Sequence, residues 1–357
     1  MAANTFLAGD LGGTKTLLSL YGQRDGQLQP LFGQRYRSGE WDCLESMLQR
    51  FLSEVPSDLP QPDTSCIAVA GPVAQGKAKL TNLPWVLSEE ALANATGLRQ
   101  LELVNDFAVL IHGLPHFDQQ QQVVLQEAQT PTAPNSNQAT NGPVAILGAG
   151  TGLGMARGIS GNQGWVALAS EGGHREFAPR TEEEWQLACW LRRDLNLERL
   201  SVERIVSGTG LGHVMRWQLQ QPGASGHPLH QAADAWVSKP VDDAEYQDLP
   251  ALVGQAAHQG DAVASTALEL WLGAYGSAAG DLALQELCSG GLWIGGGTAV
   301  KQLQGLKSAA FLEPMRQKGR FRGFIESLRV QAVIDANAGL FSAACRARDL
   351  ARASTCA

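Results

Sequence analysis

The sequence predicts an α/β protein with two domains. Short apolar strands alternate with helical segments along most of its 357 residues, and this alternation is typical of sheets flanked by helices. A glycine-rich turn follows the apolar strand at 5–8, and a second follows the strand at 143–147. A chain of this length also exceeds what one hydrophobic core usually holds. We expect a small domain over 1–115, on which 335–357 pack, and a large domain over 116–334.

Local patterns predict the elements of the small domain. Leu44, Met47, Leu48 and Phe51 recur at helical spacing and predict a helix over 41–54. A further helix begins at Phe107 and ends near Gly113 and Pro115. Runs of apolar and β-branched residues predict strands at 5–10, 16–22, 29–37, 66–70 and 101–104.

The large domain begins after a change in composition. Residues 119–142 are rich in Gln, Asn, Thr and Pro, which predicts a surface excursion without chemistry around a short apolar run at 123–125. Glycines 273, 276 and 280 predict a packing stripe on one long helix. Predicted helices lie at 182–195, 210–220, 242–258, 261–287, 298–304 and 338–350, with a strand at 292–294.

Composition argues against several classes of protein. The net charge is −8, the sequence pI is near 5.4 and no run of Lys or Arg forms a basic stripe, so we expect neither nucleic acid nor an anionic membrane as a partner. No signal peptide or membrane span is expected. The six cysteines show no CxxC spacing, which favours reduced thiols in a cytoplasmic protein over a zinc site or disulfides.

The two glycine-rich turns predict phosphate binding. Glycine lets a phosphate approach the backbone N–H groups, which form an anion-binding nest. An aspartate inside the first turn repels a bare phosphate but suits Mg²⁺. A third glycine cluster either packs a strand against a helix or admits a flat adenine. The turns comprise Gly9, Asp10, Leu11, Gly12, Gly13 and Thr14, then Gly148, Gly150, Thr151 and Gly152, and then Gly295, Gly296 and Gly297.

Asp106 follows a predicted strand, at the edge where open α/β sheets bind their ligands. A carboxylate there can accept a proton from a substrate hydroxyl, as phosphoryl transfer requires. The alternative is a helix N-cap, which either Asn105 or Asp106 could supply.

Three further segments offer polar side chains. Glu171 and His174 lie on a glycine turn, where they could bind a small polar ligand, hold a metal or simply face solvent. Glu203 by itself is typical of an exposed helix residue. Asn82 could present its amide to a sugar hydroxyl or only form a β-turn before Trp85.

Taken in order, these segments resemble bacterial-type glucokinases of the hexokinase/actin-like ATPase superfamily. The resemblance implies a two-domain actin-like ATPase (ribonuclease H-like) fold, with mixed sheets flanked by helices and a cleft between the domains. The motifs are GDLGGT (9–14), TNLPW (81–85), LVNDF (103–107), GAGTGLG (148–154), EGGH (171–174), ERIVSGTGL (203–211), IGGG (294–297), KGRF (318–321) and DANAGL (335–340).

The resemblance also implies an activity and roles. The protein would transfer a phosphoryl group from ATP to the 6-hydroxyl of glucose, as a cytoplasmic homodimer. Asp106 would be the general base and Asp10 would hold Mg²⁺, directly or through water. The glycine turns would bind ATP. The sugar would be bound by Asn82, Asn105, Asp106, Glu171, His174 and Glu203.

The sequence departs from the family pattern after the first turn. Many relatives have Asn and Arg where this chain has Lys15 and Leu17. A kinase for another hexose, a catalytically silent sugar sensor and an actin-like or chaperone-like ATPase remain alternatives. The related ROK group usually carries a cysteine-rich zinc motif, whereas Cys189 is the only cysteine in the corresponding region.

Overall fold

The computed structural model contains two compact units. Unit 1 comprises Met1–Gln121, Ala156–Ala169 and Asp335–Ala357, and unit 2 comprises Gln122–Met155 and Ser170–Ile334. The prediction that the small domain ends at residue 115 concerns domains that fold independently, and it stays a prediction. The structure describes residues 5–80, 83–129, 142–161 and 164–355, so most of the Gln/Asn-rich segment lies outside the description.

Unit 1 is built on a five-stranded sheet of order β3-β2-β1-β4-β8. β1 pairs antiparallel with β2 but parallel with β4, and β4 pairs parallel with β8. The carboxyl ends of β1, β4 and β8 therefore share one edge, where Leu11, Val69 and Asn105 are in register. The strands are β1 (Thr5–Leu11), β2 (Lys15–Arg24), β3 (Gln27–Arg37), β4 (Thr64–Val69) and β8 (Gln100–Asn105).

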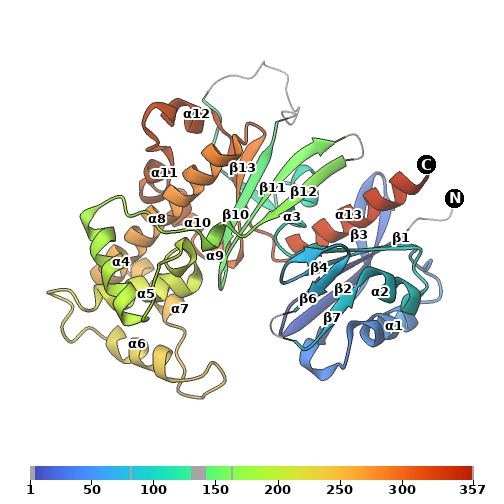
Figure 1. The fold of residues 1–357 in the computed structure, drawn as a ribbon, viewed down its shortest axis with the longest axis horizontal. Coiled ribbons are helices and arrows are strands. Elements are labelled where there is room, and N and C mark those ends of the chain that lie inside the picture. Colours follow the sequence, from blue (N-terminus) through green and yellow to red (C-terminus); the bar gives the residue numbers. More distant parts are fainter. Residues whose placement is uncertain (1–4, 81–82, 130–141, 162–163, 356–357) are drawn as a thin grey trace. The chain divides into compact units, whose positions relative to one another are not determined.

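Helices cover both faces of this sheet. Successive side chains of β1 point to opposite faces and are buried on both, so each face packs against helices. Phe6 and Ala8 pack against Ala343 of the last helix, and Leu7 packs in the core that contains Phe51. The last helix, α13, is drawn in red and lies beside the sheet (Figure 1). The helices of unit 1 are α1 (Leu44–Glu54), α2 (Glu89–Thr96), α3 (Leu110–Gly113) and α13 (Ala338–Thr355).

Unit 2 continues from a six-stranded sheet of order β12-β11-β10-β13-β14-β9, in which residues 156–169 of the outer hairpin are grouped with unit 1. β10 pairs parallel with β13, which brings Gly148 into register with Gly295 at the carboxyl ends of both strands. The strands are β9 (Gln122–Gln126), β10 (Val144–Ala149), β11 (Leu153–Gly161), β12 (Gly164–Ser170), β13 (Gly291–Gly295) and β14 (Val330–Val333).

Helix α8 is the centre of the core of unit 2. Its fully buried Trp271 donates from Nε1 to the Ser207 carbonyl at 2.9 Å. The hydroxyl of Tyr275, also fully buried, accepts the N–H of Ala149 at 3.1 Å. A Cβ at Gly276 would clash with the Phe311 carbonyl, so this glycine is needed for close packing against another helix. The predicted glycine packing stripe is therefore confirmed. Through these two hydrogen bonds, α8 fixes the chain at Ser207 and at Ala149, the last residue of β10, and both residues lie next to glycines.

The remaining helices of unit 2 surround α8 or follow it in the chain. They are α4 (Glu182–Asp194), α5 (Gly208–Gln218), α6 (Leu229–Ser238), α7 (Leu249–His258), α8 (Ala262–Glu286), α9 (Gly297–Lys301), α10 (Leu303–Leu306), α11 (Ala309–Arg316) and α12 (Arg322–Ser327). A small sheet in unit 1 is made of β5 (Val73–Ala74), β6 (Lys77–Lys79) and β7 (Val86–Ser88).

Three predicted helices begin later than the sequence suggested. The helix expected over 41–54 begins at Leu44. The helix expected at 242–258 begins only at Leu249, because Asp248 caps it by accepting the Ala251 N–H and Pro250 occupies its first turn. The helix expected from Phe107 begins at Leu110, after a turn. The sequence analysis also missed α2, α6, α11, α12, β12, β14 and the small sheet.

We expect Tyr275→Phe to lower the free energy of unfolding by about 1–3 kcal/mol, because the buried Ala149 N–H loses its hydrogen-bond acceptor. Urea unfolding monitored by circular dichroism measures the change. Tyr246→Phe is the control, since the Tyr246 hydroxyl bonds to no other described residue. A loss no larger than that of the control would show that the hydroxyl does not hold the strand end.

A second prediction concerns acid stability. Burial, assisted by the charge of Arg346, lowers the pKa of His112 from 6.5 to about 3. Between these values the unfolded chain binds a proton at His112 that the folded chain does not, so stability falls as the pH falls below 6.5. We expect His112→Gln to flatten the decline of the urea midpoint between pH 7 and about 5. The exposed His258→Gln should leave that slope unchanged.

Candidate functional site

In unit 1, the first glycine turn lies between β1 and β2 and is held by Ser38. The Ser38 hydroxyl donates to the Gly12 carbonyl at 2.8 Å, and its N–H donates to the Thr14 carbonyl at 3.1 Å. The Gly12 N–H donates to the Lys15 carbonyl at 3.0 Å. A Cβ at Gly9 would lie 2.6 Å from the Ile67 side chain, so the strand before the turn is closely packed. These contacts give the turn a defined shape.

Asp10 is the acidic residue of this turn segment. Burial raises the pKa of its carboxyl, and the charge of Lys15 opposes the rise. Its Oδ2 lies 3.5 Å from the place that a Cβ would take on Gly339, in the first turn of α13. Mg²⁺ commonly uses one or two protein carboxylates and takes its other ligands from water and substrate phosphates. A buried, partly compensated carboxylate beside a glycine turn fits that ligand set.

Asn105 is the last residue of β8 and Asp106 directly follows it, on the same sheet edge as Asp10. The Asn105 Oδ1 accepts the N–H groups of Phe107 and Ala108, both at 3.0 Å. Its Nδ2 donates to Gly71 O and to Asp106 Oδ1, both at 3.1 Å. Asn105 therefore caps the turn, and capping does not explain the exposed carboxylate of Asp106.

The predicted sugar ligand Asn82 lies outside the described residues. Among the flanking residues, the Leu80 N–H donates to the Trp85 carbonyl at 3.3 Å. Trp85 is buried, so the aromatic residue of this motif belongs to the core of unit 1.

In unit 2, the second glycine turn is held by a hydrogen bond of its own backbone and by hydrogen bonds to Gly208 and Glu203. Gly150 donates its N–H to the Gly152 carbonyl at 2.8 Å and accepts the Gly208 N–H at 2.7 Å. Glu203 Oε2 accepts the N–H of Leu153 at 2.9 Å. A Cβ at Gly152 would lie 2.5 Å from that oxygen, so the glycine is needed for the close approach.

Glu171, His174 and Glu203 come together beside this turn. His174 Nε2 lies 3.8 Å from Glu171 Oε2, and His174 Nδ1 lies 3.9 Å from Glu203 Oε1. Glu203 is part of a short 3-10 turn and its side chain is only 27% exposed, so the interpretation as an exposed helix residue is wrong. Together the three side chains offer two carboxylates and an imidazole to one polar ligand.

A cavity of about 1030 Å³ opens beside the second turn and combines backbone and apolar walls. Gly150, Thr151 and Gly297 were predicted from sequence, and all three line it. Trp236 and Tyr246 supply aromatic surface. The sequence analysis missed four lining residues close to the glycine turns, which are Gly208, Thr209, Thr298 and Lys301.

Part of that omission was avoidable. The sequence Ser207-Gly208-Thr209-Gly210 repeats the glycine–threonine pattern, and the Ser207 hydroxyl caps α5 by accepting the Gly210 N–H at 2.9 Å. Thr298 donates from its hydroxyl to the Ala149 carbonyl at 2.6 Å, which no local pattern indicates.

The third glycine cluster serves close packing at one position and lines the cavity at another. Gly296 has φ +82°, and a Cβ there would lie 2.6 Å from the Ala149 carbonyl. Gly297 begins α9 and lines the cavity, and Gly295 ends β13. Both interpretations of this cluster therefore find support, at different residues.

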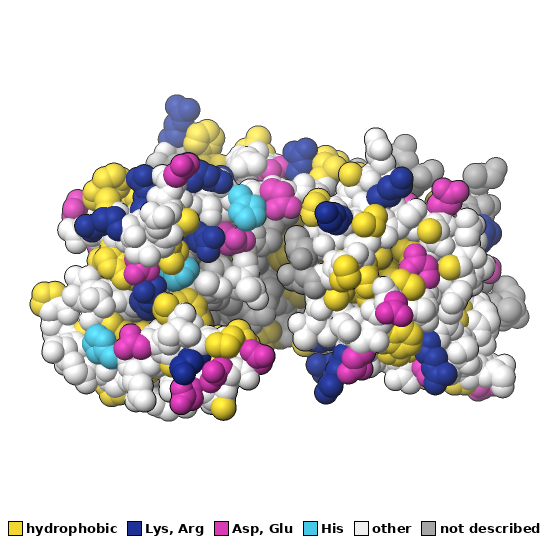
Figure 2. Space-filling model, turned by 60° about the horizontal axis from the view of Figure 1, so that its bottom comes forward, with side chains coloured by type: hydrophobic (Ala, Val, Ile, Leu, Met, Phe, Trp, Pro, Cys, Tyr) yellow, Lys and Arg dark blue, Asp and Glu magenta, His cyan; other side chains and the backbone are white. Residues whose placement is uncertain are grey.

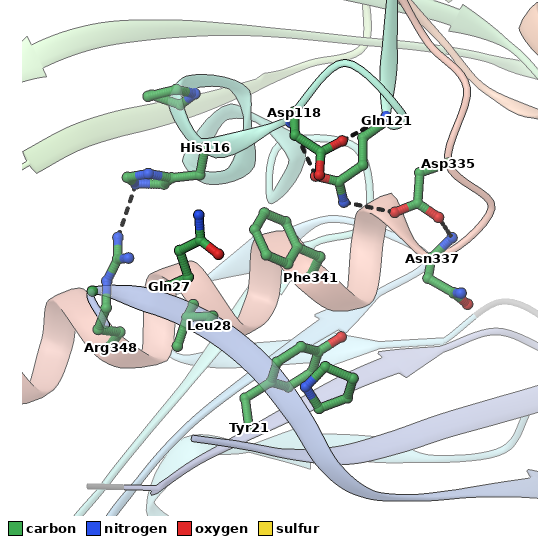
Figure 3. Close-up of a pocket in the computed structure, with 13 residues that line it drawn as sticks. Tyr21, Gln27, Leu28, His116, Asp118, Gln121, Asp335, Asn337, Phe341 and Arg348 are labelled. Atoms are coloured by element: carbon green, nitrogen blue, oxygen red, sulfur yellow. Dashed lines mark hydrogen bonds between the residues drawn. The ribbon is translucent and has the colours of Figure 1, made fainter. Parts of the chain in front are cut away.

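A separate cavity of about 530 Å³ in unit 1 contains none of the predicted site residues (Figure 3). His116 Nε2 and Arg348 lie 2.8 Å apart on one side of it, and Gln121 donates to Asp335 at 2.8 Å on another. The polar groups that face this cavity largely bond to one another.

On the face drawn in Figure 2, acidic and basic side chains are interspersed rather than gathered into a basic area. Among the helices that the structure describes, none is long and apolar enough to cross a membrane.

Known proteins resemble this chain over nearly its whole length. A family model described as Glucokinase matches residues 7–350. A glucokinase of Synechocystis sp. is 39% identical over 350 residues, which cover 95% of this chain and 96% of that protein.

Solved structures show the same fold. A glucokinase from an Antarctic psychrotroph matches with a TM-score of 0.77 at 29% identity, covering 97% of this chain and 99% of the other. A ROK family glucokinase from Streptomyces griseus, in complex with glucose and AMPPNP, matches with a TM-score of 0.58 at 20% identity, covering 97% and 99%. The predicted actin-like ATPase fold class is confirmed. Because the family model and the Synechocystis relative both span almost the whole chain, this protein belongs to the glucokinase family and is an enzyme of that family.

Proposed function

We propose that the enzyme transfers the terminal phosphoryl group of Mg-ATP to the 6-hydroxyl of D-glucose. The observation that supports the proposal is the shared edge of β1, β4 and β8, because Asp10, near the end of β1, and Asp106, directly after β8, both lie at that edge. A general base and a metal-binding carboxylate near a phosphate loop are the groups that phosphoryl transfer needs.

The nucleotide binds in the cavity of unit 2. Gly150 and Thr151 approach the phosphates, while Trp236 and Tyr246 provide apolar surface for the base. The α5 helix begins at Gly208 on the cavity wall, and its N-terminus favours negative charge. A kinase of the same fold is known in complex with AMPPNP, an analogue of ATP. The first turn, from Gly9 to Thr14, binds the phosphoryl group that is transferred.

The sugar is recognised by the cluster of Glu171, His174 and Glu203, which pairs with the donor and acceptor groups of a polyol. Glu203 uses Oε2 to hold the second glycine turn, so Oε1 is the oxygen left for the sugar. Asn82 remains a predicted ligand. A sugar contact from Asn105 would require one of its hydrogen bonds to open, and its main role is to position Asp106.

Asp106 accepts the proton of the 6-hydroxyl as the oxygen attacks the phosphorus. The hydrogen bond from Asn105 Nδ2 to Asp106 Oδ1 orients the carboxylate at the sheet edge. When bound, Mg²⁺ neutralises charge on the phosphates. Asp10 would hold the ion, directly or through water. The enzyme acts as a cytoplasmic homodimer.

The first test is a hexose panel. Purified enzyme with Mg-ATP should form glucose 6-phosphate, and excess EDTA should stop the reaction until Mg²⁺ is restored. Mannose, fructose and N-acetylglucosamine are the comparison substrates. Turnover with one of these and not with glucose would contradict the specificity. Glucose binding by calorimetry without any turnover would indicate a sugar sensor.

We expect Asp106→Asn to lower kcat about 10²–10⁴-fold, because the amide cannot accept the hydroxyl proton. Glucose affinity, measured by calorimetry, should change little. Asp58→Asn is the matched control, since Asp58 is exposed and lies away from the sheet edge. A kcat close to that of the control would show that Asp106 is not the base.

A further inference from the structure

A cavity of about 890 Å³ in unit 1 joins the first glycine turn to the end of β3. Its charged lining residues are Lys15, Arg35, Arg37 and Glu40. We propose that Lys15, Arg35 and Arg37, here called the cationic surface, bind the phosphate group of a substrate or product. The inference rests on the proposed function, because it assigns the ligand as a nucleotide terminal phosphate or a sugar phosphate.

Strand register places these three side chains on one face. Lys15 is paired with Arg37, and Leu17 with Arg35, in the antiparallel ladder of β2 and β3. Paired residues of such a ladder lie on the same face, as do residues two apart in one strand. All three cationic side chains therefore project from the same side of the sheet, next to the turn.

The same face carries Asp10. Asp10 pairs with Leu17 across β1 and β2, and Leu17 pairs with Arg35 across β2 and β3. The three residues form one row across three strands, so the Asp10 and Arg35 backbones are about 10 Å apart. A long arginine side chain can reach from β3 toward a phosphate held beside Asp10.

The charges of this surface are poorly balanced within the protein. Lys15 and Arg37 lie directly opposite each other on neighbouring strands, and a cross-strand pair of like charges is destabilising. Arg37 pairs with Glu40 at 3.3 Å, but both side chains are largely exposed, so the pair contributes little. Lys15 and Arg35 form no ion pair with another residue of the described chain. An anion would relieve this repulsion.

The turn itself favours an anion at this place. The carbonyl oxygens of Gly12 and Thr14, which would repel a phosphate, accept hydrogen bonds from Ser38. Gly12 and Gly13 carry no side chain that would block approach to the backbone. The surface also stands out in a protein whose net charge is −8. Guanidinium groups match phosphate geometry through paired N–H donors.

The test compares Lys15→Ala and Arg35→Ala with Arg24→Ala, which removes the same charge at the far end of β2. If the surface binds the donor, each of the first two variants should raise the KM for Mg-ATP about tenfold, with the KM for glucose unchanged. If it binds the product, inhibition by glucose 6-phosphate should weaken by a similar factor instead. Thermal melts check that the variants fold.

Pyrophosphate titration by calorimetry gives a readout that does not depend on activity. We expect Lys15→Ala and Arg35→Ala to bind pyrophosphate about tenfold more weakly than the wild-type protein does, and Arg24→Ala to bind it with unchanged affinity. Kinetic constants and pyrophosphate affinity equal to those of Arg24→Ala would overturn the inference. If the wild-type protein shows no kinase activity, and both variants still bind pyrophosphate more weakly than it does, the proposed function is refuted and the phosphate site stands.

Discussion

The parallel pairing of strands is the constraint on which both halves of the candidate site depend. In unit 1 it brings the ends of β1, β4 and β8 to one edge, and in unit 2 it brings the ends of β10 and β13 to another. Parallel strands end together, so segments that are distant in sequence deliver their polar residues to a common place. Asp10 and Asp106 lie at the same sheet edge for this reason.

Glycine turns provide access to the backbone but lack side chains that could hold their shape. Neighbouring polar groups supply that support: Ser38 binds the first turn, while Glu203 and Tyr275 bind the second and the strand before it. Glu203 also faces His174, so one carboxylate links the second glycine turn, proposed to bind the nucleotide, to the cluster proposed to bind the sugar. A change at such a residue would affect both ligands.

Charge in unit 1 is arranged around a buried acid. Asp10 is desolvated, and its pKa is raised by burial although Lys15 opposes the rise. The first turn of α13 lies beside this carboxylate, and helix N-termini favour negative charge. The register of β2 and β3 puts Arg35 directly across from Leu17, which in turn pairs with Asp10, so a guanidinium lies in the same row as the acid.

Local patterns in the sequence determined most strands, the long helix α8, the glycine turns and the residue types of the site, because periodicity and glycine content are properties of short segments. The start of α7 was misplaced since Asp248 and Pro250 outweigh the apolar pattern before them. Only tertiary structure decided that Glu203 supports a turn 50 residues away. Tertiary structure alone also decided that Lys15, Arg35 and Arg37 share a face. Those relations depend on which strands pair and in what register, and pairing is settled by packing across the whole chain.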